Sequence, residues 1–192
     1  PKLREALLNA QFDLSQQGKS AVLILIGGVD GAGKGETVHL LNEWMDPRHI
    51  RTVAFGEPTD EERERPMMWR FWRSLPPRGK IGIVFDSWYT APIVERVAGR
   101  SGDAKLVNAI DRILHFERML SDEGVLILKF WFHLSKMAQK KRLEALESNP
   151  RTRWRVTALE WKRYKAYDKF ARVSAHVLRE TSTADAPWTV VE

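Results

Sequence analysis

The sequence of 192 residues contains no cysteine, which excludes disulfide bonds and thiolate metal sites and is compatible with the cytoplasmic location that we expect. No apolar run approaches the ~20 residues that a membrane-spanning helix needs, so we expect no membrane partner. The five histidines lack HExxH or other paired-ligand spacing, which argues against zinc. Internal repeats and Gly/Ser linkers are also absent, and the length favours one domain that spans residues 1–192.

Acidic residues are outnumbered, giving a formal net charge of +6 and a pI of about 9.7. Such an excess of Lys and Arg favours polyanionic partners, namely nucleic acid, phospholipid head groups or phosphate chains. A solvated basic surface without any polyanion is an equally good interpretation. No helix-turn-helix, zinc or aromatic RNA-binding motif accompanies the charge, so nucleic acid ranks low as a partner.

Helical and strand-like patterns alternate along the chain, which predicts an α/β fold in which helices cover a parallel sheet. Continuous apolar runs are typical of strands buried on both faces. We expect five strands in a three-layer α/β/α sandwich, at residues 20–29, 49–55, 80–85, 125–132 and the WTVV run near the C-terminus. Helices are expected within 1–17, at 34–45, 61–74, 104–122 and 157–179, and after a Ser135 cap.

The strongest local motif is GVDGAGKGET at residues 28–37. It lies between a strand-like run and an amphipathic helical pattern, which is the context that a phosphate-binding loop (P-loop) requires. Glycines let the chain turn tightly and aim backbone N–H groups inward, while the helix N-terminus and a lysine supply positive charge. The expected phosphate-binding residues of the loop are Gly28, Gly31, Gly33, Lys34, Gly35 and Thr37.

Two positions in the loop leave alternatives open. Gly35 follows Lys34, where such loops normally carry the Ser or Thr that reaches a metal ion, and Thr37 is the nearest substitute. Asp30 is either a turn residue or a ligand that holds magnesium or orients an attacking phosphate. A glycine-rich turn without any ligand is the alternative interpretation of the whole motif.

These residues resemble the polyphosphate kinase 2 family, whose loop carries an Asp at the same place and a Gly after the Lys; Glu36 stands where the family usually has a second Gly. The stretch EPTDEERERPMMWRFWRSLPPRGKIGIVFDSWYTAPIVERV resembles the family's lid and second catalytic strand. FERMLSDEGVLILKFWFHLS and TSTADAPWTVVE resemble its later segments. The resemblance implies a P-loop kinase fold of the thymidylate-kinase-like type, with a helical lid at about residues 57–79.

Within the family, the sequence resembles the class that phosphorylates AMP to ADP with polyphosphate, many of whose members contain two fused family domains. LREALLNAQFDL, GAGKGETVHLLNEWMDPR and RFWRSLPPRG resemble the N-terminal domain. We therefore expect the chain to come from a longer polypeptide with a second family domain, and to form a homo-oligomer. The implied partners are inorganic polyphosphate and AMP or ADP, and the implied cofactor is Mg²⁺.

The second catalytic strand departs from the family pattern. Active members usually end it with Asp or Asn, then Arg, then Ser, whereas this sequence reads Phe85, Asp86 and Ser87. Phe85 has no oxygen to bind a metal, and Asp86 repels phosphate where the family has an arginine. Asp86 reaches the metal only if the register shifts by one residue. Asp30 and Asp86 are the expected metal ligands. The loss of a carboxylate at position 85 is expected to impair catalysis.

The resemblance also implies roles for basic residues outside the loop. Arg70 and Arg73 lie three apart on the expected lid helix and would close over the site, binding phosphate oxygens. Arg96 and Lys129 match family positions and would face polyphosphate. The alternatives are an exposed basic helix face for the lid pair, a surface charge for Arg96 and a strand-end salt bridge for Lys129. The expected catalytic residues are Asp30, Lys34, Arg70 and Arg73.

Three functions remain open on this reasoning. The first is a polyphosphate-dependent kinase that converts AMP to ADP. The second is a non-catalytic domain that binds polyphosphate or packs against an active partner domain, favoured by Phe85 and Asp86. The third is an ATP-dependent small-molecule kinase, which shares the loop but not the family-like lid and C-terminal segment.

Overall fold

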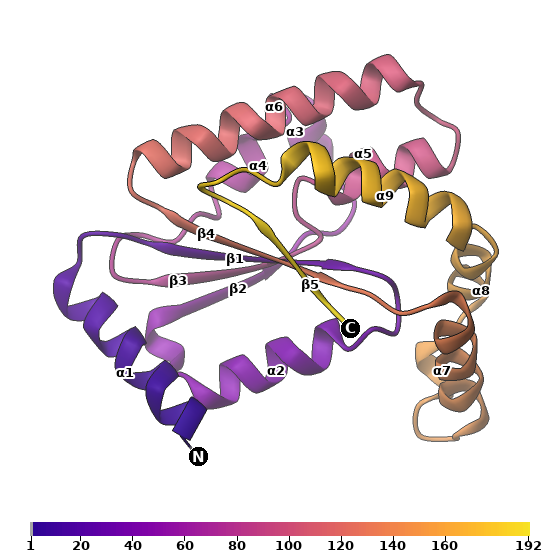
Figure 1. Ribbon diagram of the computed structural model, residues 1–192, viewed down its shortest axis with the longest axis horizontal. Helices are drawn as coiled ribbons and strands as arrows, with labels where there is room; N and C mark the ends of the chain where they lie inside the picture. Colours follow the sequence, from indigo (N-terminus) through magenta and orange to yellow (C-terminus); the bar gives the residue numbers. More distant parts are fainter. Residues whose placement is uncertain (1) are drawn as a thin grey trace.

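The computed structural model describes residues 2–192 and contains one parallel sheet with helices on both faces (Figure 1). The strand order is β2-β3-β1-β4-β5, and every pair of neighbours is parallel. The strands are β1 Val22–Gly28, β2 Ile50–Ala54, β3 Ile81–Phe85, β4 Leu126–Phe132 and β5 Trp188–Val191. The predicted three-layer sandwich is confirmed, and the predicted strand ends differ from the observed ones by at most two residues.

The α-helices are α1 Lys2–Gln17, α2 Lys34–Trp44, α3 Asp60–Arg63, α4 Trp69–Trp72, α5 Thr90–Val97, α6 Asp103–Asp122, α7 Lys136–Ser148, α8 Ala158–Lys165 and α9 Tyr167–Thr181. Two short 3₁₀ helices, η1 Pro47–His49 and η2 Arg153–Arg155, complete the chain. In the part of the chain that the structure describes, no helix has the length and apolar character to cross a membrane.

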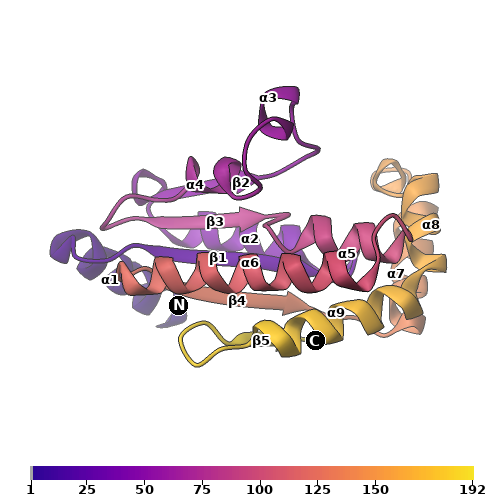
Figure 2. The same cartoon turned by 90° about the horizontal axis from the view of Figure 1, so that it is seen from above.

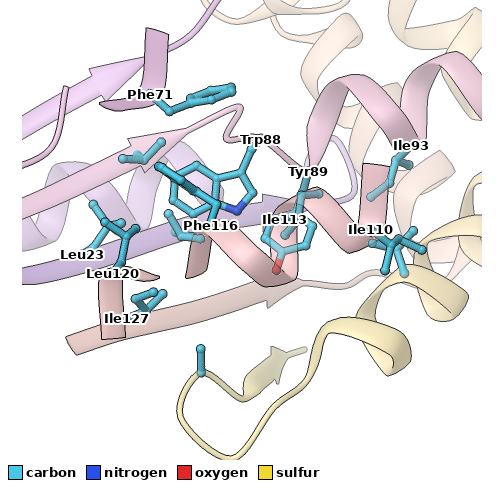
Figure 3. Packing of buried hydrophobic residues seen from close by; sticks show 14 of the residues in the cluster. Leu23, Phe71, Trp88, Tyr89, Ile93, Ile110, Ile113, Phe116, Leu120 and Ile127 are labelled. Carbon is cyan, nitrogen blue, oxygen red and sulfur yellow. The ribbon is translucent and has the colours of Figure 1, made fainter. Parts of the chain in front are cut away.

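The central strand β1 is buried on both faces, which explains its continuous apolar sequence. Leu23 and Leu25 belong to the core under α4, α5, α6 and α9, while Ile24 and Ile26 belong to the core on the opposite face with α1 and α2. Figure 3 shows the first of these cores, where Trp88 lies between Phe71 and Phe116. The two cores fix β1 at the centre of the sheet, and with it the loop that follows.

The helix predicted at residues 61–74 is wrong as a single element. Two short helices stand there instead, α3 and α4, with Pro66 between them. Proline lacks the N–H that a helix interior needs, and its ring clashes with the carbonyl four residues earlier. A capping box between Thr59 and Glu62 starts α3, and in Figure 2 this helix projects away from the sheet.

The helix predicted at 157–179 is also divided, into α8 and α9, at Ala166. The Tyr167 hydroxyl donates to the Leu134 carbonyl at 2.7 Å, so α9 begins against the segment that follows β4. The predicted Ser135 cap is confirmed, because its side chain accepts a hydrogen bond from the Ala138 N–H. Helices α7, η2 and α8 form what we call the helical arm, residues 136–165, which lies beyond the carboxyl ends of the strands (Figures 1 and 2).

Candidate phosphate-binding and active site

The loop after β1 has the geometry of a P-loop. Gly33 adopts a left-handed conformation (φ +88°) at the N-cap of α2, and Lys34 begins the helix. The Lys34 ammonium donates to the Gly28 carbonyl at 2.6 Å and lies 3.6 Å from the Asp30 carboxylate. The lysine therefore folds back over its own loop, and its charge adds to that of the helix N-terminus.

Gly28 is required by a close approach between strands. Its φ is +128°, and a Cβ atom there would lie 2.0 Å from the carbonyl oxygen of Phe132 on β4. The neighbouring Val29 N–H donates to that same carbonyl at 2.9 Å, which ties the first turn of the loop to β4. Any side chain at this position must separate the two strands or distort the loop.

We expect Gly28→Ala to lower the free energy of unfolding by about 2–4 kcal/mol, because it combines overpacking with a strained φ. Gly35→Ala is the matched control, since its Cβ meets no atom within 4 Å and its φ is ordinary. Its effect should stay within about 1 kcal/mol. Denaturant unfolding of the two variants measures both values, and equal stabilities would contradict the close approach.

Asp86, directly after β3, has an unusual backbone. Its φ is +48°, and it is the one non-glycine residue with positive φ among residues 2–192. Asp tolerates this region better than most residues, yet the conformation is sparsely populated and often marks a functional position. At this residue the backbone turns from the end of β3 toward the core, where the next three residues, Ser87, Trp88 and Tyr89, are all buried.

A cavity of about 530 Å³ opens at the carboxyl ends of the strands, within the size range of small-molecule sites. Its polar wall contains Asp30, Lys34 and Asp86, together with Arg163 from the arm. Its apolar wall comes from α5 and α9 and includes Ile93, Val97 and Phe170. The cavity can therefore hold a ligand that is apolar at one end and anionic at the other.

A second, smaller cavity of about 170 Å³ borders the same loop. Three loop glycines line it, Gly31, Gly33 and Gly35, and so does Lys34. The opposite wall is formed by Phe85 and by two arginines of the arm, Arg142 and Arg155. Lys34 thus borders both cavities, whereas Thr37 lines neither of them.

Three arginines of the arm contact the two acidic residues of the loop region. Arg142 and Arg155 lie 3.5 Å and 3.2 Å from the same oxygen of Glu36. Arg163 lies 3.2 Å from Asp30, on the side of the larger cavity. The arm therefore surrounds the loop with positive charge from a segment that is distant in sequence.

The structure contradicts the prediction that Lys129 faces polyphosphate. Its side chain is fully buried in β4 and donates to Glu117 (2.7 Å), the Tyr89 hydroxyl (3.1 Å) and the Thr181 carbonyl (2.7 Å). All three N–H groups of the ammonium are used, so none is left for a phosphate oxygen. The salt-bridge alternative describes this residue, although the pair is deep in the core rather than at a strand end.

The other predicted arginines have partners within the protein. Arg70 donates to the Gly56 carbonyl at 3.0 Å, while Arg73 is exposed and stacks over the Trp69 ring at 4.7 Å. Arg96 forms a hydrogen-bonded ion pair with Asp103. None of these three arginines lines either cavity, so their phosphate-binding roles remain predictions.

A family model described as polyphosphate kinase 2 matches this chain over residues 1–192. The chain belongs to the polyphosphate kinase 2 family. This confirms the resemblance inferred from the loop, the lid segment and the later motifs.

Among curated members, the polyphosphate:AMP phosphotransferase of Pseudomonas aeruginosa is 56% identical over 191 residues, which cover 100% of this chain and 38% of that protein. The AMP/ADP-polyphosphate phosphotransferase of Meiothermus ruber is 32% identical, over 97% of this chain and 72% of its own. The crystal structure of polyphosphate kinase 2 from Arthrobacter aurescens TC1 superimposes with a TM-score of 0.94 at 31% identity, covering 98% of this chain and 68% of that one.

In this polyphosphate kinase 2 domain, the structure brings Asp30, Lys34 and Asp86 together at one cavity. Sequence reasoning missed the arm arginines, Arg142, Arg155 and Arg163. The basic run KKRLEALESNPRTRWR contains the first two, but such a run is usually a solvated helix face and does not by itself indicate a site. Their proximity to the loop depends on how α7 and α8 fold back, which no local pattern reveals.

Proposed function

We propose that this chain is the phosphotransferase domain of a polyphosphate:AMP phosphotransferase, moving a phosphoryl group from inorganic polyphosphate to AMP. The observation that carries the proposal is that Lys34 borders two cavities of different character. Phosphoryl transfer needs a donor and an acceptor phosphate on either side of a shared positive charge. The names of the relatives supply the identities of donor and acceptor.

The chemistry of each cavity favours one of the two ligands. The smaller cavity offers glycine backbone, Lys34, Arg142 and Arg155, which suit a chain of phosphates without a base. The larger cavity has the apolar wall that a nucleobase requires and Arg163 for a phosphate. In this arrangement, Lys34 neutralises the phosphoryl group as it passes from one cavity to the other.

Asp30 and Asp86 are the proposed ligands for Mg²⁺. No group of three or more His, Cys, Asp or Glu residues is placed to hold a metal ion anywhere in residues 2–192. Two carboxylates on one cavity nevertheless fit magnesium, which is usually held by one or two carboxylates plus substrate phosphates. The ion would supply neutralisation of phosphate charge, while Arg163 keeps the Asp30 carboxylate oriented.

Three further features belong to the same proposal. The segment 57–79 is the proposed lid, in which the exposed Arg73 would leave its contact with Trp69 to reach a bound phosphate chain. A second family domain in the same polypeptide and a homo-oligomeric assembly are proposed as well. The chain spans 38% of the length of the Pseudomonas aeruginosa relative, which leaves room for a further domain in a protein of that size.

The test is ADP formation from AMP, long-chain polyphosphate and Mg²⁺ by the chain of 192 residues, with Lys34→Ala as the blank for contaminating kinases. We expect ADP in the wild type and background in the variant. ATP offered in place of polyphosphate distinguishes the third function, because an ATP-dependent kinase would prefer it.

The second candidate function is a non-catalytic polyphosphate-binding domain, favoured by the strand end of β3. Phe85 lines the smaller cavity but offers no oxygen to a metal, and Asp86 has the strained backbone described above. Binding of polyphosphate by wild type but not by Lys34→Ala, without any ADP, would select this candidate over the first.

A further inference from the structure

Glu36 occupies a position in the smaller cavity that the proposed function leaves unexplained. It lies in the first turn of α2, is about half exposed (49%), and faces the arm across the cavity. A carboxylate repels phosphate, yet this one lies on the wall that would receive the donor chain.

One oxygen of Glu36 bridges the two arginines of that wall. Arg155 Nη2 lies 3.2 Å and Arg142 Nη2 lies 3.5 Å from Glu36 Oε1. An oxygen shared by two guanidinium groups is also the arrangement in which arginines bind a phosphate oxygen. The carboxylate therefore uses the donors that an incoming phosphate would need.

The charge state of Glu36 agrees with this role. A hydrogen bond from its own backbone N–H, followed by the contact with Arg155, lowers the pKa of the carboxyl group. Glu36 is consequently ionised at neutral pH. Arg142 also lies close to the loop, since its Cγ is 3.3 Å from the point where a Cβ of Gly31 would stand. The bridged guanidinium groups thus rest directly over the P-loop.

We propose that Glu36 is an internal competitor for the phosphate donor, which holds Arg142 and Arg155 at the P-loop until a phosphate chain displaces its carboxylate. The inference rests on the proposed function only in taking the smaller cavity as the donor site. It predicts that Glu36 weakens the affinity of the smaller cavity for the phosphate donor. Removal of the Glu36 charge should therefore strengthen donor binding.

The test measures binding of tripolyphosphate by calorimetry at fixed ionic strength, without AMP. Tripolyphosphate is short, so most of its contacts fall within one small cavity. We expect Glu36→Gln to tighten binding by about threefold to tenfold, because it removes two partly exposed ion pairs, each worth up to about fivefold. Glutamine keeps the shape of the side chain and removes only the charge.

Glu144→Gln is the matched control. Glu144 also belongs to the helical arm, on α7, and pairs with Lys140 at 3.7 Å, but it lines neither cavity. The control changes the net charge by the same amount and should alter the affinity by less than about twofold. If both variants gain the same affinity for tripolyphosphate, the change in net charge explains the gain and the proposal is overturned.

A double-mutant cycle with Arg155→Gln tests the route of the effect. Adding Glu36→Gln to Arg155→Gln should give less than about half of the gain seen in the wild-type background, since the arginine to be released is absent. No gain from Glu36→Gln, or weaker binding, overturns the proposal even if ADP forms. Absence of ADP together with a gain through Arg155 would instead remove the proposed activity and leave the competitor in place.

Discussion

Replacing Lys129 by Met is expected to lower the free energy of unfolding by about 3–5 kcal/mol, because the change leaves Glu117 charged and unpaired in the core. Both side chains of the pair are buried, at 0% and 4% exposure, and their charged atoms are 2.7 Å apart. Trp88 and Tyr89 also donate to the Glu117 carboxylate, so the loss spreads to the turn that follows Asp86. Denaturant unfolding followed by tryptophan fluorescence measures the change.

Lys105→Met provides the comparison for this prediction. Lys105 lies 2.8 Å from Glu95, nearly the same separation, but its side chain is 67% exposed. Removing an exposed pair should cost at most about 1 kcal/mol. If both variants lose the same stability, burial does not strengthen the Lys129 pair and the prediction fails.

A second variant separates loss of charge from loss of packing. Adding Glu117→Gln to Lys129→Met removes the uncompensated charge while keeping an acceptor for Trp88. We expect the double variant to recover part of the lost stability. Burial lowers the pKa of Lys129, and the charge of Glu117 partly opposes this shift. Burial is also the main cause that raises the pKa of Tyr89, and the Glu117 charge adds to it. The network therefore contains one pair of opposite charges, on Lys129 and Glu117, and a neutral Tyr89.

Lys34→Ala is expected to lower the rate of phosphoryl transfer by about 10²–10³, the usual effect of removing one positioned donor from a transition state. Lys34 is the residue common to the two cavities, and its ammonium is held within 2.6 Å of the Gly28 carbonyl. The measurement is the initial rate of ADP formation at saturating AMP and polyphosphate.

The stability of the Lys34 variant must be measured beside its rate. Lys34 is only partly buried, so the variant should unfold within about 1 kcal/mol of the wild type. Lys105→Ala, which removes a distant lysine, should retain the full rate. If the Lys34 variant keeps more than about a tenth of the activity, phosphoryl transfer does not depend on this loop and the prediction fails.

Local patterns predicted the sheet and the loop because the relevant interactions are local or repeat along a strand. The apolar run of β1 and the glycine spacing at 28–37 both encode their structure within a few residues. The prediction of one lid helix was wrong for an equally local reason, because Pro66 divides the segment into α3 and α4.

The remainder of the site depends on contacts between distant segments. Arg163 and Asp30 are 133 residues apart in the sequence, yet their side chains lie 3.2 Å apart. The role of Lys129 is likewise decided by Glu117 and Thr181, which no spacing rule connects to β4. The family resemblance implied a phosphate contact for Lys129, whereas its burial and three fixed partners exclude it.

The contact between Gly28 and Phe132 has a consequence for the order in which the protein is built. During synthesis β1 emerges first, but it lies in the middle of the sheet and needs β3 and β4 on either side. The first turn of the P-loop can close only when Phe132 has left the ribosome and paired with it. An anion that binds this loop would therefore stabilise chains in which β4 has paired with β1, and not shorter ones.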